Sequence, residues 1–153
     1  MQQRFDMMKE APDSFRALLA LETHIRASGI EPRLLHLIKI RASQINGCTY
    51  CVDMHVRDAR KDGMAPQWLD LIVVWKESPL YDERERAVLG FVEEVTDVAA
   101  TGIGDAAYAE IARFFDVAGL SKILVAIGMI NVWNRMSLAQ RLVHPVDRTS
   151  VAA

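Results

Sequence analysis

The stretch RLLHLIKIRASQINGCTYCVDMHVRDARKDG, residues 33–63, holds the pattern that decides the fold of this chain. Apolar residues recur at helical spacing in its first half, with Leu34 and Ile38 on one stripe, and again in its second half. Between the halves, Asn46 and Gly47 predict a helix end, because glycine tolerates the left-handed backbone that closes a helix. We therefore expect two helices joined by a tight turn.

The second of these helices begins with Cys48 and Cys51, the only two cysteines in the chain, and His55 follows four residues later. If Cys48 lies in the first turn, Cys51 is rotated from it by roughly 60° around the helix axis and His55 by roughly 20°. The three side chains then share one face at a helix N-terminus, where a thiol pKa is lowered. This arrangement suits dithiol chemistry, in which one thiolate attacks, the other resolves and an imidazole handles the proton.

Other interpretations of the cysteine pair stay open. The cysteines could be buried filler, because free cysteines often act as small hydrophobes. Together with the following histidine they could bind zinc, with His36 or Asp53 as a fourth ligand. Covalent haem attachment needs a histidine directly after the second cysteine, and Val52 stands there. A thioredoxin fold would place the motif after a strand, and no strand pattern precedes it.

The rest of the chain has the same helical periodicity, without sustained alternation of apolar and polar residues. Start and stop signals predict the remaining helices. They span about 13–29, starting at Asp13 or Ser14; 66–78, starting at Pro66; 82–101, with Asp82 and Glu85 at capping-box spacing; 104–116; and 121–139, starting at Ser121. We expect an all-α bundle of six or seven helices, with no sheet, forming one domain over residues 1–153.

The overall composition is that of a soluble globular protein, with 51% apolar and 25% charged residues. A net charge of -2 gives no electrostatic reason to expect binding to nucleic acid or an anionic membrane. The longest apolar stretch, 123–133, is too short to span a bilayer, and no signal peptide is visible. Asn131 and Asn134 within it predict a polar contact between helices or subunits.

We expect a cytoplasmic protein, whose thiols are kept reduced, so the cysteine pair is redox-active or metal-binding rather than a structural disulfide.

Three segments resemble the alkylhydroperoxidase D (AhpD)-like proteins of the carboxymuconolactone decarboxylase-like superfamily. They are LIKIRASQINGCTYCVDMHVRDARKDG, LIVVWKESPLYDERERAVLGFVEEVT and INVWNRMSLA, and the resemblance covers roughly residues 15–140. It implies an all-helical homo-oligomer, a trimer or hexamer, that reduces organic hydroperoxides without a metal or cofactor. Electrons would come from an external dithiol such as a lipoyl-bearing protein. By the same resemblance, Cys48 and Cys51 are the redox pair and His55 handles the proton.

The chain departs from the family at one position. The proton relay of the family commonly includes a glutamate about three turns before the first cysteine, and His36 stands there. A neutral imidazole can accept a proton, so His36 either continues the relay or is a hydrogen-bonded helix residue with the relay broken. Glu85 is a candidate replacement carboxylate, although its capping-box position gives it a simpler structural role.

The roles of the two thiols follow from their neighbours. Cys48 is nearer the helix N-terminus, whereas Cys51 has His55 one turn away, which favours Cys51 as the attacking thiol and Cys48 as the resolver. A broken relay would leave a slower peroxidase or a general disulfide oxidoreductase. A non-enzymatic redox sensor or binding protein is a separate alternative. Lactone decarboxylation, the chemistry of the other branch of the superfamily, does not need a cysteine pair and is less favoured.

Overall fold

The computed structural model describes residues 2–146; residues 1 and 147–153 lie outside it. Helices make up most of the described chain, and no β-strand occurs within residues 2–146, which confirms the all-α prediction. The α-helices are α1 Met7–Glu10, α2 Pro12–Arg26, α3 Pro32–Ile45, α4 Thr49–Lys61, α5 Pro66–Asp70, α6 Glu83–Thr96, α7 Val98–Thr101, α8 Asp105–Ala112 and α9 Val117–Gln140, and a 3-10 helix spans Leu71–Glu77.

Each expected segment is helical in the structure, and the four-residue helix α1 is additional. The segment predicted as one helix over 82–101 is divided, because α6 ends at Thr96 and α7 begins at Val98. The predicted capping box is confirmed, since the Glu85 N–H donates to Asp82 and the Glu85 side chain accepts from the Asp82 N–H. The predicted start of the last helix at Ser121 is wrong. Helix α9 begins at Val117, because the Asp116 side chain accepts a hydrogen bond from the Gly119 N–H at 2.7 Å and caps the helix earlier.

The segment predicted as one helix over 66–78 is divided. Helix α5 passes into the 3-10 helix, in which Val74 has non-helical angles of φ -120° and ψ 28°. In a 3-10 helix, residues three apart lie on the same side, which directs Ile72 and Trp75 into the core and leaves Val73 and Val74 exposed. The two adjacent β-branched valines also lower the preference for α-helix here.

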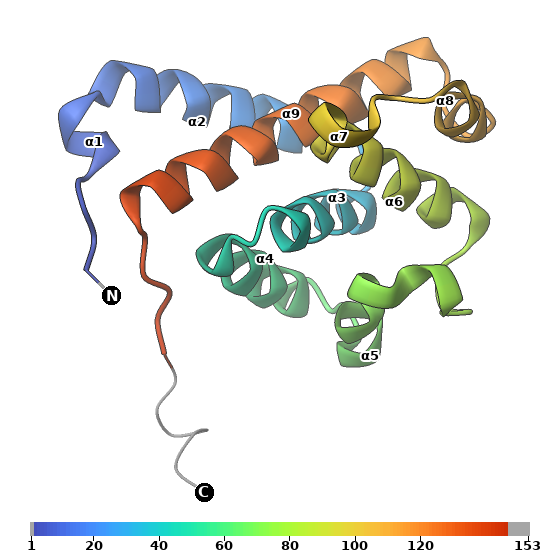
Figure 1. Ribbon diagram of the computed structural model, residues 1–153, viewed down its shortest axis with the longest axis horizontal. Coiled ribbons are helices and arrows are strands. Elements are labelled where there is room, and N and C mark those ends of the chain that lie inside the picture. The colour runs from blue at the N-terminus through green and yellow to red at the C-terminus, as the bar shows by residue number, and fades with distance from the viewer. Residues whose placement is uncertain (1, 147–153) are drawn as a thin grey trace, which may run out of the picture.

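Helix α3 lies at the centre of the molecule and packs against α4, α6 and α9 (Figure 1). Its burial extends beyond the stripe read from the sequence, because Leu37 and Ile40, which lie off that stripe, are fully buried as well. The turn to α4 forms as expected, with Gly47 at φ +66°. Helices α3 and α4 therefore hold a fixed position relative to the core.

Helix α9 crosses the whole molecule beside α2 (Figure 1). It is long and apolar enough to span a membrane by length and composition, with a mean hydropathy of 1.4 over its most apolar window. Core helices pass the same test, and α9 packs on α2, α3, α4, α6 and α8. It also buries hydrogen-bonded Asn131 and Asn134, so we describe it as a core helix with one outward apolar face.

Candidate active site

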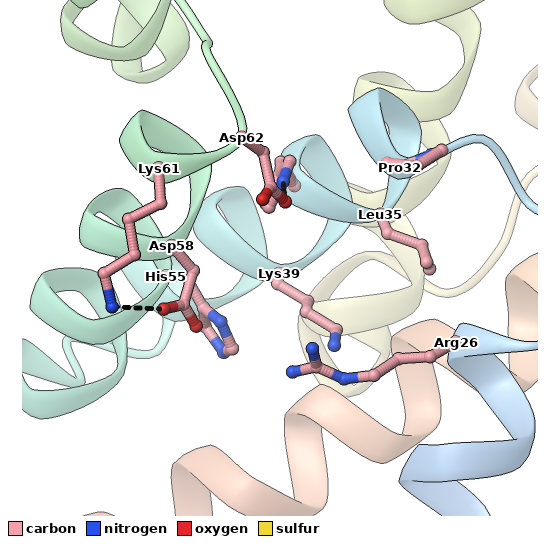
Figure 2. Close-up of a pocket in the computed structure, with 9 residues that line it drawn as sticks. Arg26, Pro32, Leu35, Lys39, His55, Asp58, Lys61 and Asp62 are labelled. Atoms are coloured by element: carbon pink, nitrogen blue, oxygen red, sulfur yellow. Dashed lines mark hydrogen bonds and ion pairs between the residues drawn. The ribbon is translucent and has the colours of Figure 1, made fainter.

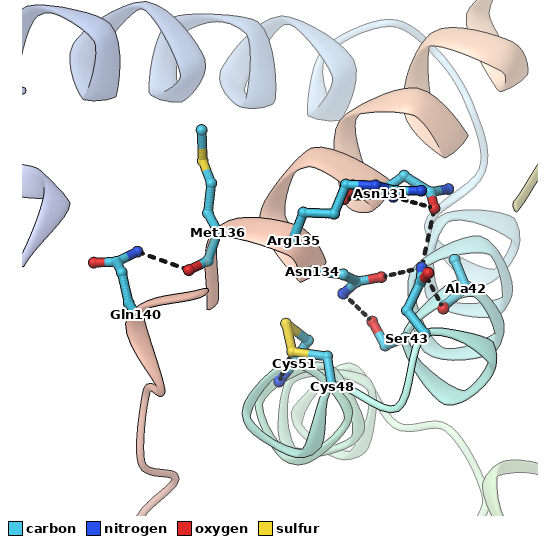
Figure 3. The surroundings of a disulfide bond; sticks show 10 residues. Ala42, Ser43, Cys48, Cys51, Asn131, Asn134, Arg135, Met136 and Gln140 are labelled. Carbon is cyan, nitrogen blue, oxygen red and sulfur yellow. Dashed lines mark hydrogen bonds between the residues drawn. A yellow bond between two sulfur atoms is a disulfide. The ribbon is translucent and has the colours of Figure 1, made fainter. Parts of the chain in front are cut away.

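The turn between α3 and α4 joins the two cysteines in a disulfide (Figure 3). Cys48 is the N-cap of α4, one position before the first turn, and its sulfur accepts a hydrogen bond from the Cys51 N–H at 3.3 Å. The Cα atoms are 5.3 Å apart, and each cysteine is 1% exposed. The zinc alternative requires at least three His, Cys, Asp or Glu side chains grouped around one point. No such group occurs within residues 2–146. The cysteine pair is thus joined at the N-terminus of α4, where the free N–H groups of a helix favour negative charge.

A buried polar network fixes this turn to α9 (Figure 3). The Asn46 side-chain amide donates to the Oδ1 atoms of Asn131 at 3.0 Å and Asn134 at 2.9 Å. The Asn134 amide in turn donates to Ser43 Oγ at 2.9 Å. The predicted polar contact of Asn131 and Asn134 is thus one between helices of the same chain.

Cys51 opens onto a cavity of about 330 Å³, which we call the thiol cavity. Helices α2, α4 and α9 and the N-terminal segment form its walls, and most of the lining side chains are apolar. The lining residues are Asp6, Met8, Phe15, Leu19, Glu22, Arg26, Tyr50, Cys51, Met54, His55, Trp133, Met136, Ser137, Gln140 and Leu142. Cys48 is not among them, so the two sulfur atoms differ in their access to the cavity.

The N-terminal segment covers one side of the thiol cavity with Asp6 and Met8. It is attached to the last residue of α9 by backbone groups. The Arg4 N–H donates to the Gln140 carbonyl oxygen and the Met7 N–H donates to Gln140 Oε1, both at 2.8 Å. The stretch from Arg4 to Met8 is therefore part of the wall of the thiol cavity.

A second cavity of about 330 Å³, the polar cavity, lies on the other side of His55 (Figure 2). Figure 2 shows Arg26 and Lys39 reaching toward the side of α4 that carries His55 and Asp58. The lining residues are Arg26, Pro32, Leu35, His36, Lys39, His55, Asp58, Lys61 and Asp62. His55 and Arg26 line both cavities, so they stand at the boundary between an apolar and a charged compartment.

His55 is 5% exposed, and its Nε2 atom has no hydrogen-bond partner within residues 2–146. The pKa of His55 is lowered to about 3, chiefly by burial and next by the positive charge of Lys39, while Glu22 opposes this effect. The imidazole is therefore neutral at physiological pH. A neutral imidazole can accept a proton from a nearby thiol or pass one on.

The two other residues considered for the relay lie away from the thiol cavity. His36 Nε2 is 2.8 Å from Asp62 Oδ2, at the C-terminal end of α4 and about 20 Å along that helix from Cys48. His36 nevertheless lines the polar cavity together with His55. Glu85 forms its capping box and an ion pair with Arg33, and it lines neither cavity, in agreement with its structural interpretation.

Sequence reasoning missed Glu22 on α2, a carboxylate that lines the thiol cavity as Asp6 also does. It forms ion pairs with the buried Lys39 and with Arg26 Nε at 3.1 Å. Burial raises the pKa of Glu22, but its hydrogen bonds and cationic neighbours outweigh this and lower it, so the group is ionised. The available signal was Lys39 itself, a lysine within the apolar run LLHLIKI, which needs a buried partner.

The fold and sequence match known proteins. The model of the carboxymuconolactone decarboxylase (CMD) family matches residues 12–94. The uncharacterized protein YdfG of Bacillus subtilis (strain 168) is 34% identical over 139 residues, which cover 91% of this chain and 95% of YdfG.

Two solved structures extend this comparison. ATU0492 from Agrobacterium tumefaciens, a protein of unknown function suggested to be the antioxidant defence protein AhpD, has a TM-score of 0.93 and 49% identity. The match covers 95% of this chain and all of ATU0492. The debrominase Bmp8 has a TM-score of 0.80 at 22% identity, covering 91% of this chain and 75% of its own, and so shares the fold. The chain therefore belongs to the carboxymuconolactone decarboxylase family, as a member with the AhpD-like helical fold.

Proposed function

We propose that the protein is a thiol-dependent peroxidase that reduces organic hydroperoxides through Cys48 and Cys51. One observation carries the proposal: Cys51, half of a CxxC pair at a helix N-terminus, shares an apolar cavity with the neutral His55. The suggested antioxidant role of ATU0492, at 49% identity, is consistent with it. Few other reactions need two neighbouring thiols, an imidazole and a cavity in this arrangement.

In the first step, the Cys51 thiolate attacks the terminal oxygen of the hydroperoxide, and the thiol proton passes along the neutral His55 without remaining on it. The S–O bond forms as the O–O bond breaks, and the leaving alkoxide takes the proton to give an alcohol. Cys51 is now a sulfenic acid. The Cys48 thiol then attacks the Cys51 sulfur, and the S–S bond forms with release of water.

The disulfide must be reduced before the next turnover. An external dithiol, such as a lipoyl group carried by a partner protein, would supply two electrons and two protons by thiol–disulfide exchange. A reducing compartment such as the cytoplasm fits this requirement. His36, beside Asp62 in the polar cavity, would connect His55 with solvent protons.

The walls of the thiol cavity indicate the class of hydroperoxide. Phe15, Leu19, Met54, Trp133 and Met136 give it an apolar surface, and its volume of about 330 Å³ is in the range of small-molecule sites. An apolar organic group would displace water from these side chains, which hydrogen peroxide cannot do. We therefore propose organic hydroperoxides as the preferred substrates.

The test is stopped-flow oxidation of the reduced protein by cumene hydroperoxide, followed through tryptophan fluorescence and thiol titration. We expect rapid loss of both thiols in the wild type. Cys51→Ser should abolish the reaction, whereas Cys48→Ser should stop at a sulfenic acid that dimedone traps. Persistence of both wild-type thiols for many minutes at millimolar peroxide would contradict the proposal.

A general disulfide oxidoreductase is the alternative favoured by a separate observation. The Cys48 sulfur accepts the Cys51 N–H, which stabilises a Cys48 thiolate and makes it a good leaving group in disulfide exchange. This alternative predicts fast exchange with small disulfides and no acceleration by hydroperoxides in the same stopped-flow experiment.

A further inference from the structure

The buried ion pair between Lys39 and Glu22 has no part in the chemistry described so far. Lys39 is 5% exposed and lines the polar cavity, whereas Glu22 lines the thiol cavity. The pair thus lies in the wall between the two cavities, together with Arg26 and His55. Buried ion pairs contribute little net stability, because desolvation offsets their attraction. A role in the site is therefore a better explanation of the pair than a role in folding.

The cluster formed by Lys39, Arg26 and Glu22 carries one excess positive charge. Two of the other acidic groups around the cavities have a cationic partner that offsets their charge, Asp58 with Lys61 at 3.7 Å and Asp6 with Lys9 at 3.9 Å. Asp62, whose Oδ2 lies 2.8 Å from His36 Nε2, is about 16 Å along α4 from Cys51, so its effect on the sulfur is weaker than that of the cluster. Helix α9 contributes only uncharged residues to the thiol cavity.

The effect of this charge is visible at His55. Among the charged groups, Lys39 has the largest effect on the pKa of His55 and lowers it, and the opposing effect of Glu22 is smaller. The net potential at His55 is therefore positive. Cys51 lies one turn earlier on the same face of α4 and lines the same cavity. A positive potential that disfavours an imidazolium favours a thiolate.

We propose that Lys39 stabilises the thiolate of Cys51 in the reduced protein, and that Glu22 limits how much positive charge reaches the sulfur. Lys39 acts at a distance through the wall of the cavity, so it is a positioning residue that tunes the nucleophile. The inference rests on the proposed function in one respect, since it takes Cys51 to be the reactive thiol of the reduced protein.

The test measures the pKa of Cys51 through the pH dependence of its alkylation by iodoacetamide, in a Cys48→Ser background with mass-spectrometric readout. Lys39→Met removes the excess charge and should raise the Cys51 pKa by about one pH unit, which slows alkylation at neutral pH roughly tenfold. Glu22→Gln adds net positive charge and should lower the Cys51 pKa. The two substitutions break the same ion pair, so a purely structural role predicts shifts in the same direction.

Two further variants keep the test decisive if a single substitution loosens the fold. Lys39→Arg keeps the charge and should restore a pKa close to that of the parent. In the double variant Lys39→Met with Glu22→Gln, Arg26 is the one charged residue left in the cluster, so the net charge of the cluster is unchanged. The Cys51 pKa of this variant should therefore also stay close to that of the parent. Equal pKa values in all variants, or shifts in one direction for both single substitutions, would overturn the inference. Alkylation involves no peroxide, so its outcome is independent of whether the protein proves to be a peroxidase.

Discussion

Cys51 and His55 lie one helical turn apart on α4, and of the two cysteines only Cys51 lines the thiol cavity. This difference in access supports the assignment of attack to Cys51 and of resolution to Cys48, whose sulfur is tied to the helix N-terminus. In the proposed reaction, His55 would pass a proton on rather than hold it, because the protein makes its cationic form unfavourable. The rise of thiol reactivity with pH should therefore follow the Cys51 thiol and not His55.

The lowered pKa of His55 predicts acid sensitivity of the fold. The unfolded chain protonates this residue below about pH 6.5, whereas the folded chain does so only near pH 3. Between these values the unfolded state binds more protons, so the free energy of unfolding falls as the pH drops, by roughly 1.4 kcal/mol per pH unit. Urea unfolding from pH 7 to pH 4 should show a weaker pH dependence in His55→Asn. His24→Asn, at an exposed position on α2, is the matched control and should retain the full dependence.

The turn between α3 and α4 depends on α9 for its shape. Asn134 is fully buried and connects Asn46 to Ser43, directly beside the cysteines. A helix that packed through apolar contacts alone would leave the polar groups of the turn without partners. The network thus couples the position of the dithiol to the packing of the last helix.

Asn134→Ala should leave the buried Ser43 Oγ without its side-chain partner, while Asn46 keeps Asn131 and the Ala42 carbonyl, and should lower the free energy of unfolding by about 1–3 kcal/mol. Urea denaturation of the reduced protein measures this loss. Lys122→Ala, at an exposed position of the same helix, should change stability by less than about 0.5 kcal/mol. Equal stability of the two variants would show that the network does not hold the turn.

Local signals in the sequence predicted much of the fold and the dithiol end of the site. The Asn46–Gly47 stop, the capping box at Asp82 and the spacing of the cysteines each depend on residues close together in the chain. The 3-10 helix depends on which side chains are buried, and the start of α9 depends on the single cap at Asp116. The spacing of apolar residues in the sequence reveals neither. Glu22 could not be assigned, because its partner Lys39 lies 17 residues further along the chain and meets it only in the folded structure.

At the level of the whole molecule, the outward face of α9 stays uncovered. Val117, Leu124, Val125 and Leu138 are all at least 44% exposed, on a helix with only 39% of its most apolar window buried. An uncovered apolar face of this kind marks a contact surface in soluble proteins. We propose that it forms the contact between subunits of the expected homo-oligomer.

Leu124→Glu with Leu138→Glu should therefore shift the protein to a smaller assembly, because the introduced carboxylates would be buried without partners at the contact. Sedimentation velocity at micromolar concentration measures this change. Val73→Glu, at an exposed position of the 3-10 helix, is the control for an added surface charge. A wild-type protein that sediments as a monomer would rule out this contact.

The hydrogen bonds from Arg4 and Met7 to Gln140 have a practical consequence for anyone producing this protein. Asp6 and Met8, which line the thiol cavity, lie close to these bonds, so a bulky group attached near Arg4 would crowd the cavity that Cys51 lines. Kinetic measurements should therefore be made with this stretch of the chain unaltered.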